Sequence, residues 1–298
     1  MFNKKFYSMI FAFLLTFSLL MTDVSAELDG NSQNYESFNH TGVLDDVSIS
    51  EEEIIKSELE EKERDKEIEL FFNESEKIPS FSYTNSSELK EAVEFLGVSI
   101  PVDPKEINQI PDGQWYSVYM ASRKQINGYY CGPAAVQQNL SFHKNSTTGL
   151  PSQDTLAKLA GTTKAGSSSY GLRDALNKYT STYKFTKYVV GNVTTSQQTT
   201  WENRIKSNLI NARRAPIILL QTRHLPRYKN KDIRHYNSVR SWSYDYTNNV
   251  KKVRNVDPHY SNIYYGQHWD PVGSSKTKGA FLATAKAYRS GGNPNMIY

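Results

Sequence analysis

A change of charge near position 110 divides this 298-residue chain into two parts of opposite sign. Residues 27–110 contain 22 Asp and Glu against 7 Lys and Arg, a net charge of −15. Residues 111–298 contain 8 acidic and 26 basic residues, a net charge of +18. Such charges attract over a Debye length of about 8 Å at physiological salt. The division predicts an acidic prosegment lying on a basic domain, with a disordered, solubilising tail as the alternative.

The first 26 residues have the pattern of a secretory signal peptide. Lys4 and Lys5 precede an uncharged stretch, 6–22, that is rich in Phe, Leu, Ile and Met. Val24-Ser25-Ala26 then supplies small residues at the spacing that a signal peptidase accepts. The apolar stretch is short for a membrane anchor, which is the alternative, and no later stretch is apolar for long enough. We therefore expect secretion, without stable membrane insertion after cleavage.

The acidic part, 27–110, is expected to contain two helices and a tether. Residues 28–50 lack hydrophobic periodicity and are expected to be loosely held. Residues 51–72 carry dense Glu and Lys, with opposite charges three or four apart, which predicts a long solvated helix. A short apolar stripe predicts a second helix over 87–97, and prolines mark a linker over 101–111.

The basic part, 111–298, shows helical patterns first and strand patterns second, which predicts an α+β domain. Apolar residues three or four apart, or a proline start, predict helices over 133–143, 153–160, 170–179 and 201–211. Short apolar or aromatic runs predict strands over 217–220, 236–246 and 250–256, with a tight turn between the last two.

Cys131 is the only cysteine in the chain. An unpaired cysteine in an exported protein indicates a reactive thiol or an intermolecular bridge, with a buried inert thiol as the alternative. It stands just before the helix that starts at Pro133, and Gly132 allows the backbone to approach closely. Unpaired N–H groups and the helix dipole at such a terminus favour the thiolate, which is the nucleophilic form. Cys131 is therefore our candidate nucleophile.

A nucleophilic thiol needs an oxyanion donor and a base. Gln125, six residues earlier, can fold back and donate a hydrogen bond beside the sulfur, although a surface role for it is the alternative. Of the histidines outside the acidic part, His235 is the best placed, because it opens a strand that would hold it rigidly. The other histidines are His40 in the acidic part, His143 at the far end of the nucleophile helix, His224 in a loop, and His259 and His268 in a later aromatic segment.

The imidazole also needs an acceptor that fixes its tautomer. Asp257 follows the strand after His235, and Asp270 is the competitor. Both precede proline, and an Asp-Pro pair is commonly a turn, so the residues alone leave this role open. The spacing of His259 and His268 matches no standard metal site.

The succession of these motifs resembles the C39-like peptidase domains of exported bacterial proteins. It covers roughly 116–258: a glutamine six residues before CGPAA, a helix pair, APIILL, HYNSVRSWSYD and RNVDP. Such domains often continue after the histidine strand to a glycine-tyrosine pair, where this chain has Arg240-Ser241-Trp242. The resemblance implies a papain-like fold, in which a helical part carries the cysteine and an antiparallel sheet carries the histidine and aspartate. It implies thiol hydrolase activity without cofactor or metal, and assigns Cys131 as nucleophile, His235 as base, Asp257 as orienter and Gln125 as oxyanion donor.

The leading hypothesis is a secreted cysteine peptidase made as a zymogen, whose acidic prosegment covers a basic cleft. Its partners would be peptide or protein substrates, its own prosegment, and anionic surfaces such as bacterial wall polymers. The alternatives are an acyl transferase or cross-linking enzyme with the same triad, and a non-catalytic secreted or wall-binding module on the same scaffold. The basic residues are spread and match no nucleic-acid reader, so nucleic acid is not expected as a partner.

Overall fold

A computed structural model describes residues 43–44, 49–75, 113–210 and 214–298. The chain forms two compact units, and the described residues all belong to the one that consists of Tyr35–Asn85 and Ile110–Tyr298. The predicted signal peptide, second acidic helix and proline linker lie outside the described residues, as does His40. No helix in the described ranges combines the length and the apolar composition that a membrane span requires.

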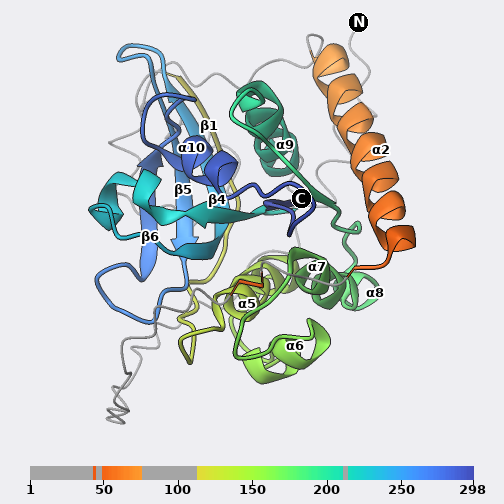
Figure 1. Ribbon diagram of the computed structural model, residues 1–298. Helices are drawn as coiled ribbons and strands as arrows, with labels where there is room; N and C mark the ends of the chain where they lie inside the picture. The colour runs from red at the N-terminus through yellow and green to blue at the C-terminus, as the bar shows by residue number, and fades with distance from the viewer. Residues whose placement is uncertain (1–42, 45–48, 76–112, 211–213) are drawn as a thin grey trace, which may run out of the picture. The chain divides into compact units, whose positions relative to one another are not determined.

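The centre of the described structure is an antiparallel sheet of seven strands, whose order is β2-β7-β3-β4-β5-β6, with β1 pairing along β4 (Figure 1). Its strands are β1 (Gly113–Ser117), β2 (Val190–Gly191), β3 (Ile217–Gln221), β4 (Arg234–Asp245), β5 (Val250–Asp257), β6 (Gly266–Pro271) and β7 (Met296–Ile297). The three predicted strands are confirmed as β3, β4 and β5. The other four strands, β1, β2, β6 and β7, were not predicted because they are short or carry few apolar residues.

Helices pack around this sheet, and the mixed helix-and-sheet fold that the sequence predicts is confirmed. Between β1 and β3 lie α5 (Cys131–Lys144), α6 (Gln153–Leu159), α7 (Ser169–Asn177), α8 (Thr180–Tyr183) and α9 (Gln198–Ile210). Two short 3₁₀ helices, η1 (Thr222–His224) and η2 (Pro226–Tyr228), follow β3, and α10 (Ala280–Lys286) follows β6. The four helices predicted in this part are confirmed as α5, α6, α7 and α9; α10 was not predicted.

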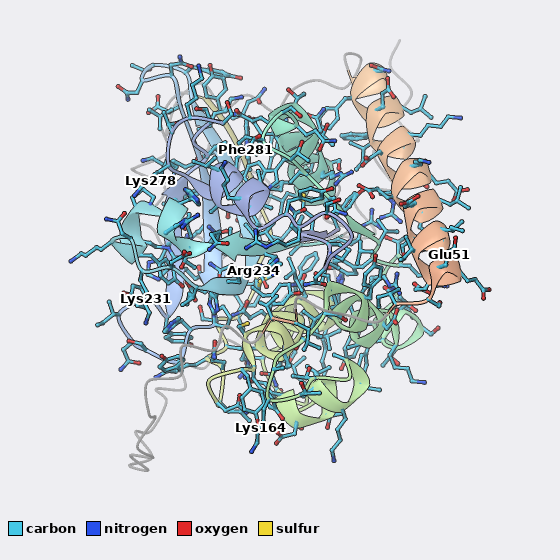
Figure 2. The ribbon with its side chains drawn as sticks, in the orientation of Figure 1. Glu51, Lys164, Lys231, Arg234, Lys278 and Phe281 are labelled. Carbon is cyan, nitrogen blue, oxygen red and sulfur yellow. The ribbon has the colours of Figure 1, made fainter. Side chains whose placement is uncertain are left out.

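The apolar run of β3 is continuous because both faces of the strand are covered. Ile217 and Leu219 lie in one buried cluster, with the side chains of α5 and α7. Ile218 and Leu220 lie in a second cluster, with Trp201 of α9 and Phe281 of α10. Figure 2 labels Phe281 on its helix. Alternate side chains of one strand thus join two hydrophobic cores on opposite faces of the sheet.

A β-bulge interrupts the pairing of β4 with β5 between Val239 and Ser241. Val239 and Trp242 are three positions apart, yet both are buried in the same hydrophobic cluster. A regular strand would point them to opposite faces, so the extra residue at the bulge accounts for the change of phase. The bulge lies at Arg240, where the chain departs from the motif that it resembles.

The acidic helix α2 (Glu51–Ser75) confirms the long helix predicted over 51–72. It contacts α9 and β2; Figure 1 draws α2 in orange. Ile68 is buried, and Phe72 packs against the same hydrophobic cluster as Trp201. The composition of 51–72 predicted a solvated helix, but one face of α2 is docked on the rest of the unit.

Buried hydrogen bonds tie α5 to β4. Asn139 Nδ2 donates to Ser238 Oγ at 3.0 Å, and Ser238 Oγ donates to the carbonyl oxygen of Ala135 at 3.2 Å. Tyr188 OH donates to Asn139 Oδ1 at 3.0 Å. These contacts fix the nucleophile helix against the strand that carries His235, three residues before Ser238.

We expect Asn139→Leu to lower the free energy of unfolding by about 1–3 kcal/mol, because the hydroxyls of Ser238 and Tyr188 would lose a buried partner. Urea denaturation followed by circular dichroism measures this difference. The matched control is Asn262→Leu, at an exposed position, which should change stability far less. Equal losses in the two variants would contradict the role assigned to the buried amide.

Candidate active site

Cys131 is the first residue of α5, and its side chain is 1 % exposed. Pro133 lies in the first helical turn, where its missing N–H costs no hydrogen bond. Gly132 is packed so closely that an added Cβ would lie 2.7 Å from a methyl carbon of Leu172 on α7. The only thiol of the chain therefore lies at the N-terminus of a buried helix, where unpaired N–H groups gather.

The imidazole of His235 lies between this thiol and a carboxylate. It forms a hydrogen bond with the Cys131 side chain, and its Nε2 lies 2.8 Å from Asp257 Oδ1. Because Nε2 is engaged by the carboxylate, Nδ1 is the nitrogen left for the sulfur. The structure thus brings Cys131, His235 and Asp257 together in the order thiol, imidazole, carboxylate, although they lie up to 126 positions apart in the sequence.

The Asp257 carboxylate is fully buried and receives several donors besides His235. Its Oδ1 accepts from the backbone N–H of His259 at 2.9 Å. Its Oδ2 accepts from Arg227 Nη1 and from Tyr228 OH, both at 2.6 Å. Arg227 and Tyr228 come from η2, and no pattern in the sequence marked them. These donors hold the carboxylate ionised and fix its orientation toward the imidazole.

Asp270, the competitor of Asp257, lies one step further from the imidazole. Arg227 Nε donates to both of its oxygens at 3.1 Å, and Asn255 Nδ2 donates to Oδ2 at 2.7 Å. Arg227 therefore bridges the two buried carboxylates. Of the two aspartates that the sequence left open, Asp257 is the one whose carboxylate contacts His235.

Electrostatic interactions favour the charged forms of His235 and Asp257. Burial by itself disfavours an imidazolium, but the Asp257 carboxylate and the Cys131 contact outweigh it and raise the pKa of His235 to about 9. Burial would also disfavour a carboxylate, but His235 and Arg227 hold the pKa of Asp257 well below its usual range. His235 is therefore cationic at neutral pH, and Asp257 is anionic.

The other described histidines lack such a carboxylate at the ring. Burial lowers the pKa of His143 to about 3, and its ring stacks on Phe185 in the hydrophobic interior. His259 is the nearest to the site, with its ring centroid 5.4 Å from that of His235. Burial and the neighbouring His235 charge lower its pKa to about 3, which makes it a poor base. His224 lies on η1, and His268 Nε2 contacts the carbonyl oxygens of Tyr264 and Tyr265.

Gln125 reaches this region through the end of β5, because its backbone N–H donates to Pro258 O at 2.7 Å. Its side chain is buried, and Nε2 donates to Asn127 O at 2.7 Å. Its Oε1 is buried without a hydrogen-bond partner. One hydrogen of the amide is thus used locally, and the other remains for a further acceptor.

Comparison with known proteins agrees with this architecture. The model of the Peptidase_C39 like family matches residues 117–288, more than half of the chain. The chain belongs to the Peptidase_C39 like family. The family resemblance inferred from the sequence is thereby confirmed, and the match extends beyond Pro258 to include β6 and α10. Both the thiol helix and the strands of the imidazole and carboxylate lie inside the matched range.

Two further comparisons add little to the family match. No curated protein sequence matches the chain significantly. Among solved structures, UfSP from C. elegans is similar over 63 % of this chain and 34 % of its own, with 12 % identity and a TM-score of 0.41. The chain thus spans about a third of that protein's length. Within the described residues, no group of three or more His, Cys, Asp or Glu side chains is arranged to hold a metal ion.

The raised pKa of His235 predicts a pH-dependent stability. The folded protein keeps a proton on His235 between pH 6.5, the ordinary value, and about 9, whereas the unfolded chain loses it. The stabilisation is complete below pH 6.5 and is lost as the pH rises through 9. We expect the free energy of unfolding to fall across this window, and His235→Gln to remove that slope in urea titrations.

His224→Gln is the control for this measurement. Burial and the adjacent Arg223 lower the pKa of His224, so its own effect on stability lies below pH 6.5 and the slope above that value should remain. Parallel stability curves for the wild type and His235→Gln would contradict the assigned ion pair.

Proposed function

We propose that this protein is a cysteine peptidase that hydrolyses peptide bonds through Cys131, His235 and Asp257. The observation that carries the proposal is the unbroken chain of contacts from the thiol through the imidazole to a buried carboxylate. A structural cysteine needs no partner of this kind, whereas a nucleophile needs a base and the base needs an orienter. Family membership supports the same reaction class.

The reaction begins with the sulfur as thiolate and His235 as imidazolium. The sulfur attacks the peptide carbonyl carbon, and the electron pair of the C=O bond moves to the oxygen. The C–N bond then breaks as His235 donates its proton to the leaving amine, which leaves a thioester on Cys131. A water molecule next attacks the thioester while His235 accepts its proton, and the carboxylic acid leaves as the sulfur regains its charge.

Two hydrogen-bond donors are assigned to the oxyanion that forms during attack. One is the backbone N–H of Cys131, which lies at the start of α5 next to the sulfur. The other is the remaining Nε2 hydrogen of Gln125. Loss of one donor of this type typically costs about 100- to 1,000-fold in rate, so Gln125→Ala should act mainly on kcat.

Secretion as a zymogen is the second part of the proposal. The signal-peptide pattern at the N-terminus supports export. The burial of the Cys131 sulfur supports latency, because a peptide cannot reach a side chain that is 1 % exposed until the chain opens. Lys164, Lys231 and Lys278 are exposed at separate places on the surface (Figure 2), which suits a diffuse attraction to acidic peptides or anionic wall polymers.

Modification of Cys131 tests the nucleophile. Because the chain has one cysteine, an alkylating reagent reports on that residue alone. We expect alkylation, or Cys131→Ala, to abolish cleavage of peptide substrates by the protein after limited proteolysis of its acidic segment. Cleavage that continues undiminished when mass spectrometry shows complete modification would overturn the proposal.

Exchanging each buried carboxylate for an amide tests the orienter. Asp257→Asn should lower kcat/KM roughly 100- to 10,000-fold, because an amide nitrogen facing His235 stabilises the wrong tautomer. Asp270→Asn is a matched control, since Asp270 is also buried and bound to Arg227 but does not touch the imidazole. Thermal unfolding separates folding defects from loss of catalysis, and equal losses in two folded variants would contradict the assignment.

A further inference from the structure

Two buried arginines hold α2. Arg173 of α7 has a side chain that is 4 % exposed and pairs with Glu53 at 2.7 Å. Arg204 of α9 has a side chain that is 2 % exposed, and it pairs with Glu61 at 2.7 Å and with Asp65 at 2.8 Å through Nε. An arginine this deeply buried is costly without a carboxylate, so the two guanidiniums define where the acidic helix binds.

These contacts anchor α2 at one edge of the sheet, away from the strands of the triad. The helix packs on β2, which is the edge strand opposite β6, and on α9. His235 and Asp257 lie on β4 and β5, nearer the other edge. The expectation that the acidic part covers the cleft stays a prediction.

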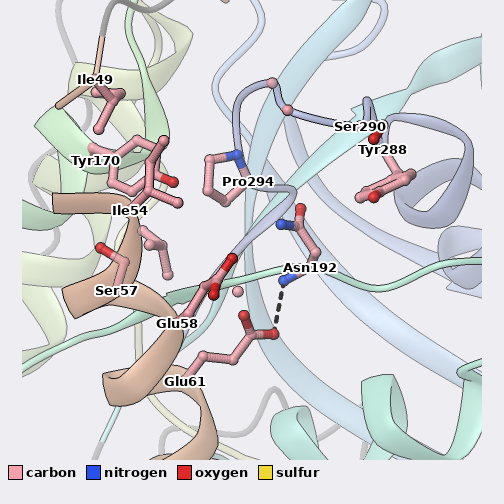
Figure 3. A pocket seen from close by; sticks show the side chains of 14 residues that line it. Ile49, Ile54, Ser57, Glu58, Glu61, Tyr170, Asn192, Tyr288, Ser290 and Pro294 are labelled. Atoms are coloured by element: carbon pink, nitrogen blue, oxygen red, sulfur yellow. Dashed lines mark hydrogen bonds between the residues drawn. The ribbon is translucent and has the colours of Figure 1, made fainter. Parts of the chain in front are cut away.

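The contact between α2 and the rest of the unit is partly open. A cavity of about 290 Å³ lies between α2 and the segments around Asn192 and Tyr288, with Glu58 and Glu61 on its helical side (Figure 3). The backbone N–H of Asn192 donates to Glu61 Oε1 at 3.0 Å along this seam. Ion pairs at the exposed rim of this contact are screened by salt, whereas the buried arginine pairs are screened much less.

The segment that precedes α2 takes a different course. Val43 forms a parallel β-bridge with Ser167, and the N–H of Leu44 donates to Ser167 O at 3.1 Å. Ser167 Oγ lies 3.0 Å from where a Cβ on Gly132 would be, directly after the nucleophile. Val43 is itself buried, in the same hydrophobic cluster as Cys131. This single bridge and one buried side chain hold the segment through backbone hydrogen bonding and an apolar contact, two of the means by which extended peptides are bound.

We infer that anchoring and blocking are separate in the acidic segment: the ion pairs of α2 anchor it, and Val43-Leu44 blocks the approach to the thiol in the manner of a bound peptide. The inference rests on the proposed peptidase function for its activity readout only. It implies that a cut after α2 leaves the segment in place, whereas a cut between Leu44 and α2 frees the blocking residues while α2 stays bound.

The test compares two engineered cleavage sites for an exogenous protease, one replacing residues 45–48 and one within 76–112. We expect the first cut to raise peptidase activity by about tenfold or more and the second to leave it nearly unchanged. Only the first cut increases the fraction of protein molecules whose thiol a substrate can reach. In both nicked proteins the α2 fragment should co-elute with the remainder at low salt. Arg173→Gln with Arg204→Gln should abolish co-elution. Full activation by the second cut alone, with α2 still bound, would overturn the inference.

A point variant tests the blocker without cutting. Val43→Asp should activate the intact chain, because a carboxylate is disfavoured in the apolar cluster beside Cys131. Ile55→Asp makes the same change at an exposed position of α2 and should not activate it. Activation by both variants or by neither, in a protein that cleaves peptides after the first cut, would contradict the inference. A protein that cleaves nothing after either cut would count against the peptidase function, while co-elution would still report on the anchor.

Discussion

The buried carboxylate of Asp257 is the interaction on which the candidate site depends. It stabilises the charge on His235, which in turn contacts the thiol. Arg227 and Tyr228 both donate hydrogen bonds to its second oxygen, Oδ2. An ion pair this far from solvent persists only when every member has its partners. The 3₁₀ turn after β3 is therefore as much a part of the site as the strands.

The scaffold supports this electrostatic arrangement through a second buried network. Asn139 and Ser238 join the nucleophile helix to β4, and the small Gly132 lets α7 approach the start of that helix. These contacts fix the thiol helix against the imidazole strand. The proposed reaction requires such a fixed distance, because the sulfur attacks the substrate and His235 donates a proton to the leaving amine at the same reacting centre.

The opposite charges of the two parts of the chain meet in a specific way. Long-range attraction could have produced a diffuse complex, but Arg173 and Arg204 concentrate it into two buried contacts with Glu53, Glu61 and Asp65. The docked face of α2 combines these carboxylates with the buried Ile68 and the partly buried Phe72. Its composition predicted a solvated helix because charged residues that bind partners elsewhere in the chain look the same in the sequence as charged residues that face water.

The sequence by itself determined the elements whose patterns are local. The apolar runs of β3 and of the main helices, the proline that starts α5 and the turn between β4 and β5 all appear in consecutive residues, as does the reactive placement of Cys131. It also narrowed the base to His235 and the orienter to two aspartates. Only the tertiary structure showed that Asp257 and not Asp270 contacts His235, introduced Arg227 and Tyr228, and placed Val43 in the same hydrophobic cluster as Cys131. Those contacts join residues that are distant in the chain, and no local pattern records which side chains folding brings within hydrogen-bonding distance.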